Sequence, residues 1–148
     1  DTVLGLAKEI NAQSALDYGC GKGLQYQDRL PDKTLEELLG FEVTKYDPAW
    51  PAFMEKPQGQ FDLVWCTDVL EHIPEEDIPW VVDELICFAK SAIFIAVPVA
   101  PSKKTLLNGQ NAHLTVKPNA WWRELIEPRI TAHNARASHP LRWKLLAG

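Results

Sequence analysis

Apolar residues along the chain show two spacings, one typical of helices and one typical of strands. A helical stripe predicts a short first helix at Val3, Leu6, Ala7 and Ile10. Short apolar runs predict strands at 14–18, 42–46, 61–66 and 92–97. Further helices are expected from Leu24 to before Pro31, after the capping-box pair Thr34 and Glu37, at 77–88 and at 120–126. The remaining residues predict one or two strands, around 130–137 and 141–146.

Strands separated by helices in this order predict an α/β fold. Such strands form βαβ units with right-handed crossovers and a largely parallel sheet. We therefore expect a Rossmann-like sandwich of three layers, with a mostly parallel sheet between helices on both faces. Sheets of this kind bind ligands beyond the carboxyl ends of their strands. The length of 148 residues predicts a single domain, 1–148.

A glycine-rich loop follows the first expected strand and opens onto a helix. Its residues are Asp17, Tyr18, Gly19, Cys20, Gly21, Lys22 and Gly23. Glycine lets a ligand approach the backbone closely, and the first N–H groups of a helix attract negative groups. The spacing differs from the G-x-G-x-x-G of dinucleotide-binding loops, and the G-K-[ST] ending of phosphate loops is absent. Either the loop binds a cofactor of another kind, or it is a tight turn without a ligand.

Polar residues also follow the second and third expected strands. Asp47 comes after the second strand, where a carboxylate can accept hydrogen bonds from both hydroxyls of a ribose. The alternative is that Asp47 and Pro48 only begin a turn. The third strand is followed by the sequence Thr67-Asp68-Val69-Leu70-Glu71-His72.

The glycine loop, Asp47 and the segment 61–74, taken in this order, resemble the class I S-adenosylmethionine-dependent methyltransferases of types 11 and 12. The first motif of that family reads acidic-x-G-x-G-x-G, and many members carry a strand followed by D-x-L-E-H-I/V. The resemblance covers residues 14–98. It implies S-adenosylmethionine as the cofactor and methyl transfer without a covalent intermediate as the reaction.

The resemblance also implies a role for each matching position. The loop wraps the methionine part of the cofactor, Asp17 helps to hold its amino group, and Asp47 binds the ribose. The implied cofactor-binding residues are Asp17, Tyr18, Gly19, Cys20, Gly21, Gly23, Asp47, Pro48, Thr67 and Asp68. The candidates for a catalytic base are Asp68, His72 and His113, the last from a segment after the fourth strand that resembles the mouth of the substrate pocket in relatives.

The chain departs from the family between Asp47 and Phe61. The thirteen residues there contain three prolines, which leave too little room for the usual helix and third strand. We therefore expect a sheet that is reduced around the third strand. Trp50 and Phe53 are candidates for stacking on the adenine or for packing in the core. Residues 102–111 are the candidate for a mobile lid.

Composition restricts the environment and the kind of site. The three cysteines lie far apart without a C-x-x-C pair, and His133 and His139 have no metal-binding spacing, so no metal site is expected. No apolar run approaches the ~20 residues of a membrane span. The first ten residues do not resemble a signal peptide. We expect a cytoplasmic protein without membrane contact.

Charge is uneven along the chain, although the net charge is only −5. Residues 1–84 hold 18 acidic and 6 basic side chains, whereas residues 85–148 hold 2 and 9. This indicates either a surface for an anionic partner or two halves that complement each other in one sheet. We expect a methyltransferase that acts on a small molecule. The alternatives are a non-catalytic cofactor-binding partner in a larger complex, and an RNA or DNA methyltransferase, which the acidic total disfavours.

Overall fold

The structure, a computed structural model, describes residues 2–148 and contains a five-stranded sheet. Its strands lie in the order β2-β1-β3-β4-β5, and every neighbouring pair is parallel. The strands are β1 (Ala15–Tyr18), β2 (Thr44–Tyr46), β3 (Phe61–Thr67), β4 (Ala89–Val97) and β5 (Arg142–Ala147). The helices are α1 (Thr2–Glu9), α2 (Leu35–Leu39), α3 (Ile78–Phe88) and α4 (Asn119–Asn134), with short 3₁₀ turns η1 (Leu24–Tyr26) and η2 (Leu70–His72).

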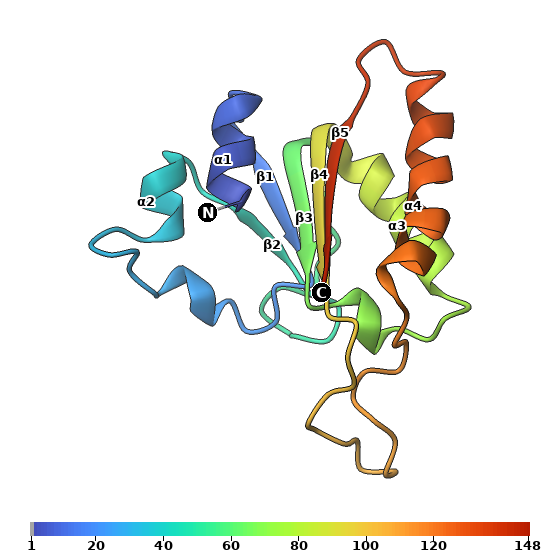
Figure 1. The fold of residues 1–148 in the computed structure, drawn as a ribbon. Helices are drawn as coiled ribbons and strands as arrows, with labels where there is room; N and C mark the ends of the chain where they lie inside the picture. The colour runs from blue at the N-terminus through green and yellow to red at the C-terminus, as the bar shows by residue number, and fades with distance from the viewer. Residues whose placement is uncertain (1) are drawn as a thin grey trace.

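Helices cover both faces of the sheet, which gives three layers (Figure 1). α1 and α2 lie on one face, and α3 and α4 lie on the other. On β3, Leu63 and Trp65 pack with the α1 side, whereas Val64 and Cys66 pack with the α3 and α4 side. Burial on both faces explains why this strand is an almost continuous apolar run. The prediction of a three-layer α/β sandwich with a mostly parallel sheet is confirmed.

α4 corrects one part of the expected element order. The prediction of a strand around 130–137 is wrong, because α4 continues through most of this segment. Trp122, Ile126 and Ile130 lie four positions apart and are all buried in the core shared with α3. Their helical spacing therefore decides the conformation of this segment. The strand expected at 141–146 is confirmed as β5.

The amino-terminal half follows its local sequence signals closely. Thr34 Oγ1 accepts a hydrogen bond from the N–H of Glu37 at 3.2 Å, and the Glu37 carboxylate accepts one from the N–H of Thr34 at 2.7 Å. This capping box begins α2, and Gly40 ends it in the left-handed conformation. The helix expected from Leu24 is shorter than predicted, because only the turn η1 forms. Residues 48–60 contain neither helix nor strand, so β2 forms a reduced sheet edge, as expected.

The connection between β4 and α4, residues 98–118, projects from the carboxyl edge of the sheet (Figure 1). The N–H of Ser102 donates to Asn111 Oδ1 at 3.0 Å, and Asn111 Nδ2 donates to the Ser102 carbonyl at 2.8 Å. These two bonds close the tip of the connection as a loop outside the core. Its movement as a lid stays a prediction.

Within residues 2–148, no helix combines the length and the apolar character needed to span a membrane.

The neighbouring tryptophans of α4 differ in burial, and this predicts different contributions to stability. Trp122 is fully buried and its indole N–H donates to the Lys117 carbonyl at 3.2 Å, whereas Trp121 is half-buried. Trp122→Ala should lower the free energy of unfolding by about 3–5 kcal/mol, because it empties a large part of the core. Trp121→Ala, the matched control, should cost clearly less. Urea unfolding measures both, and equal losses would contradict this packing.

Candidate functional site

The glycine loop leaves β1 at the carboxyl edge of the sheet and is held against the end of β2. The N–H groups of Gly19 and Cys20 donate to the carbonyl of Tyr46, at 2.7 and 3.2 Å. Gly19, Gly21 and Gly23 have φ angles of 83°, 57° and 66°. Residues with a Cβ rarely adopt this left-handed region, so the backbone of this loop requires its glycines.

The three glycines differ in how much room there is for an added Cβ atom. A Cβ at Gly19 would lie 2.3 Å from Cγ2 of Val69, and one at Gly23 would lie 3.0 Å from Cε2 of Phe53. A Cβ at Gly21 would meet nothing within 4 Å. Gly21 therefore presents bare backbone to open space, which is the arrangement that close approach of a ligand needs.

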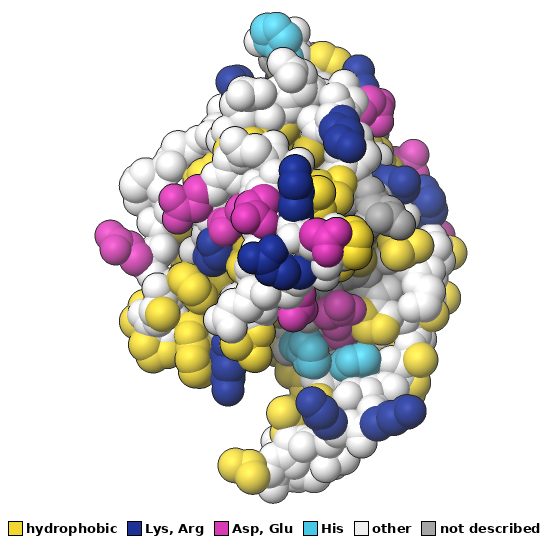
Figure 2. Space-filling view, turned by 90° about the vertical axis from the view of Figure 1, so that its left-hand side faces the viewer, with side chains coloured by type: hydrophobic (Ala, Val, Ile, Leu, Met, Phe, Trp, Pro, Cys, Tyr) yellow, Lys and Arg dark blue, Asp and Glu magenta, His cyan; other side chains and the backbone are white. Residues whose placement is uncertain are grey.

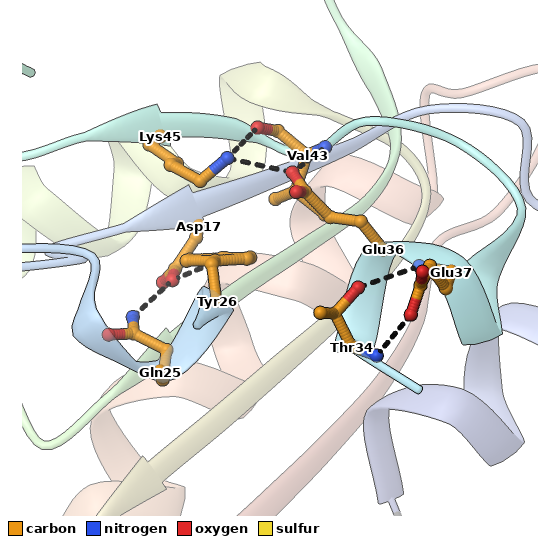
Figure 3. A network of polar contacts seen from close by, with 8 residues as sticks. All are labelled: Asp17, Gln25, Tyr26, Thr34, Glu36, Glu37, Val43 and Lys45. Carbon is orange, nitrogen blue, oxygen red and sulfur yellow. Dashed lines mark hydrogen bonds and ion pairs between the residues drawn. The ribbon is translucent and has the colours of Figure 1, made fainter. Parts of the chain in front are cut away.

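Asp17 lies in β1, one residue before the strand ends, and only 3% of its surface is exposed. Its Oδ2 accepts hydrogen bonds from the Tyr26 hydroxyl at 2.7 Å and from Gln25 Nε2 at 3.0 Å (Figure 3). Burial raises the pKa of the Asp17 carboxyl group, and these hydrogen bonds act in the opposite direction. Asp17 thus anchors η1, and its contact with the amino group of a cofactor stays a prediction.

Asp47 follows β2 and faces the glycine loop. Its Oδ2 accepts a hydrogen bond from the N–H of Gly21 at 2.8 Å, and its Oδ1 accepts one from the N–H of Ala49 at 2.8 Å. Each carboxylate oxygen can accept two hydrogen bonds, so each retains capacity for another donor. The half-buried carboxylate therefore fixes the loop and can still accept ligand hydroxyls, while the neighbouring Pro48 is exposed.

Tyr18 and Cys20 direct their side chains into the protein. The Tyr18 hydroxyl donates to Glu84 of α3 at 2.5 Å, which places this ring in the core under α3. Burial raises the pKa of Cys20 to about 12, so its thiol stays protonated at neutral pH. We expect both residues to offer backbone groups rather than side-chain chemistry to a ligand.

The segment 48–60 folds back beside the loop and brings two aromatic rings there. The Phe53 carbonyl accepts a hydrogen bond from the N–H of Asp47 at 2.9 Å, and the Phe53 ring packs against Gly23. Lys22 Nζ lies 4.9 Å from the centroid of the Trp50 ring, a cation–π distance. Both rings are half-buried, so stacking on a purine and packing in the core both remain open.

Thr67 ends β3 and is half-buried, and Asp68 makes the turn that follows. Asp68 has a φ angle of 55°, and its N–H donates to the Ala96 carbonyl of β4 at 3.0 Å. A left-handed residue other than glycine is uncommon, and such strain concentrates at functional sites. The turn leaves the Asp68 side chain exposed at the carboxyl edge of the sheet.

His72 and His113 come together from the segments that follow β3 and β4. Their ring centroids lie 5.1 Å apart, with the rings nearly perpendicular. Nδ1 of His72 lies 2.7 Å from the Ala112 carbonyl, and Nδ1 of His113 lies 2.7 Å from the Ala100 carbonyl. Because a carbonyl only accepts, each Nδ1 carries a proton, and in the neutral form of either ring Nε2 has a lone pair. The structure thus makes these two base candidates neighbours.

Glu71 lies beside these two histidines, and no functional role was predicted for it from the sequence. Its side chain is 1% exposed, and Oε1 lies 3.8 Å from Nε2 of His72. Burial raises the pKa of the Glu71 carboxyl group. The available signal was an acidic residue between the apolar Leu70 and Ile73, but spacing alone does not show which way such a side chain points.

Gly19→Ala should destabilise the fold more than Gly40→Ala does. Both glycines have similar φ angles, 83° and 82°, so the two variants share a backbone strain of about 1–2 kcal/mol. Only at Gly19 does the new Cβ collide with Val69, and overpacking adds about 1–3 kcal/mol. Adding Val69→Ala to Gly19→Ala should restore part of the loss. Thermal unfolding measures all three variants, and equal losses at the two glycines would refute the close contact.

Comparison with known proteins agrees with this geometry. A family model described as a methyltransferase domain matches residues 2–134. No curated protein and no solved structure matches the chain. The matched range includes the glycine loop, Asp47, His72 and His113, and the parallel sheet between two helical layers is consistent with a Rossmann-like methyltransferase fold. The chain therefore belongs to the methyltransferase-domain family, within the class I S-adenosylmethionine-dependent methyltransferases.

Proposed function

We propose that this chain binds S-adenosylmethionine at the carboxyl edge of its sheet and transfers the methyl group to a small-molecule acceptor. The observation that carries the proposal is the contact between Gly21 and Asp47. It places bare backbone beside a carboxylate with free acceptor capacity, at the end of two adjacent parallel strands. Family membership supplies methyl transfer as the reaction class, and these residues support the choice of cofactor.

The residues present fit this cofactor. The loop 19–23 offers an open backbone for the methionine part, and the Asp47 oxygens suit the two hydroxyls of a ribose. Thr67 and Asp68 follow β3, the other neighbour of β1, so they flank the loop on its second side. Trp50 and Phe53 are the aromatic candidates for the purine.

The chain contributes to the proposed reaction by positioning the two reactants. When bound, the cofactor supplies a methyl group that its positively charged sulfur already activates. Holding two reactants in line in a site with little water is worth about 7–11 kcal/mol. The candidates to accept a proton from the acceptor are Nε2 of His72 or His113 and the carboxylate of Asp68.

The charges at this edge favour a small molecule over a nucleic acid. Asp47 and Asp68 are acidic and would repel a phosphate backbone. Figure 2 shows this face, with acidic side chains above two adjacent histidines and lysines on the projecting segment below. Lys103 and Lys104 are the basic residues of that tip, too few to offset the net charge of −5.

Binding of S-adenosylhomocysteine tests the cofactor assignment. At a hundred times its dissociation constant, a ligand of the folded state adds about 2.7 kcal/mol of stability, so the melting temperature should rise. S-adenosylmethionine should give a similar rise, and NAD should give none. A rise with NAD alone would overturn the proposal.

Gly21→Ala and Gly40→Ala form the matched pair for this test. Both positions have a positive φ and no atom within 4 Å of an added Cβ, so the two variants should lose similar stability. Only the Cβ at position 21 enters the space assigned to the ligand. We expect Gly21→Ala to abolish the shift with S-adenosylhomocysteine and Gly40→Ala to keep it.

Turnover by the isolated chain separates an enzyme from a non-catalytic binding partner. With a panel of small acceptors, the chain should convert S-adenosylmethionine to S-adenosylhomocysteine. Asp68→Asn and His113→Gln then rank the base candidates, and loss of the true base should lower turnover about 10²–10⁴-fold. His139→Gln, in the connection between α4 and β5, is the control. Tight binding of S-adenosylhomocysteine with no turnover on any acceptor would favour the binding-partner alternative.

A further inference from the structure

The Glu71 carboxylate is buried without a partner. Its side chain is 1% exposed, and neither Oε1 nor Oε2 has a hydrogen-bond partner among the described residues. An unpaired polar group in the interior costs free energy, and an unpaired charge costs more. Native proteins retain such a group where something else satisfies it, and a cation is one such ligand.

Two imidazoles, those of His72 and His113, lie beside this carboxylate. The Nδ1 groups of His72 and His113 are committed to backbone carbonyls, at 2.7 Å each, which leaves both Nε2 atoms as lone-pair donors. Histidines that bind metals typically donate their other N–H to a carbonyl in this way. One ligand atom each from Glu71, His72 and His113 lies within 4.8 Å of the others.

The two segments that carry these side chains are fastened to each other. The N–H of Thr115 donates to the Glu71 carbonyl at 3.0 Å, and Thr115 Oγ1 donates to the Ile73 carbonyl at 2.8 Å. Together with the His72–Ala112 contact, these bonds cross-link residues 71–73 and 112–115. The three side chains are therefore held together by a built scaffold rather than by chance contact on a surface.

An ion pair between Glu71 and His72 does not satisfy the carboxylate. The distance of 3.8 Å from Nε2 to Oε1 is longer than a hydrogen bond, and Oε2 would still lack a partner. The exposed Asp68 places a second carboxylate close enough to Glu71 to interact with it electrostatically. The local charge thus favours a cation that reaches both oxygen and nitrogen donors.

We propose that Glu71, His72 and His113 form a binding site for one divalent first-row transition-metal cation of the Zn²⁺ or Co²⁺ type. Two imidazoles and one carboxylate suit these ions, whereas Mg²⁺ prefers oxygen ligands. This site goes beyond methyl transfer, and it revises the expectation from cysteine and histidine spacing that the chain has no metal site.

The geometry requires only a small closure around the cation. Metal–ligand distances of about 2.0–2.2 Å call for ligand atoms somewhat closer together than those observed here. The exposed His72 ring can supply this adjustment, because solvent borders it. Three protein ligands leave a coordination position open, and Figure 2 shows the paired histidines beside a hollow above the projecting segment.

Metal binding by the full untagged chain tests the site without the cofactor. The exposed Cys87 is replaced by serine throughout, so that a thiol cannot contribute. After chelation and dialysis, titration with Co²⁺ should show one saturable site per chain with visible absorption bands. Zn²⁺ should compete for this site and raise the melting temperature, and Mg²⁺ should bind far more weakly.

Variants then assign the ligands. His113→Gln and Glu71→Gln should each weaken Co²⁺ binding by at least ~10-fold, whereas His139→Gln should bind like the parent. If Glu71→Gln fails to fold, His72→Gln is the substitute, because its exposed side chain supports little packing. Absence of saturable Co²⁺ binding would overturn the proposal, as would equal affinity in His72→Gln, His113→Gln and His139→Gln. Because no cofactor is present, either result leaves the S-adenosylmethionine proposal to its own test.

Discussion

The buried carboxylate of Asp17 is the constraint on which the candidate site depends. A carboxylate at the end of a central strand needs donors, and Tyr26 and Gln25 of the turn η1 provide them. The chain returns to Asp17 within a few residues through a tight loop whose three glycines have positive φ angles. Lys45 extends the network, because it lies 4.2 Å from the centroid of the Tyr26 ring and 2.7 Å from Glu36 of α2 (Figure 3). The contacts of Asp17 and its neighbours thus fix the shape of the loop before any ligand binds.

Strand order decides which side chains meet at the open edge of this scaffold. All described strand pairs are parallel, so the segments that follow their carboxyl ends lie along one edge. β1 and β2 place the glycine loop beside Asp47, whereas β3 and β4 place His72 beside His113. The site therefore has two halves, one with open backbone and the Asp47 carboxylate and one with titratable side chains. This division suits the proposed methyl transfer, because cofactor and acceptor would meet between the two halves.

Features set by local sequence could be predicted, and those set by tertiary packing could not. The glycine loop and the capping box of α2 depend on neighbouring residues, so spacing was sufficient for both. The prediction of a strand at 130–137 was wrong, because a short segment with few apolar residues can fit a strand or a helix. The four-residue spacing of Trp122, Ile126 and Ile130 is what indicates the helix. The buried state of Glu71 and its approach to His113 depend on the β3–β4 pairing, which no local pattern encodes.

The two roles assigned to His72 and His113 compete for the same lone pairs. Each neutral ring has one lone pair, at Nε2, because Nδ1 is committed to a backbone carbonyl. An imidazole that holds a cation through Nε2 therefore cannot take a proton from the acceptor at that atom. Asp68 is then the remaining base candidate, since its carboxylate is exposed and lies outside the set of three ligands. Its left-handed backbone forms the turn that links β3 to η2, the segment that carries Glu71 and His72.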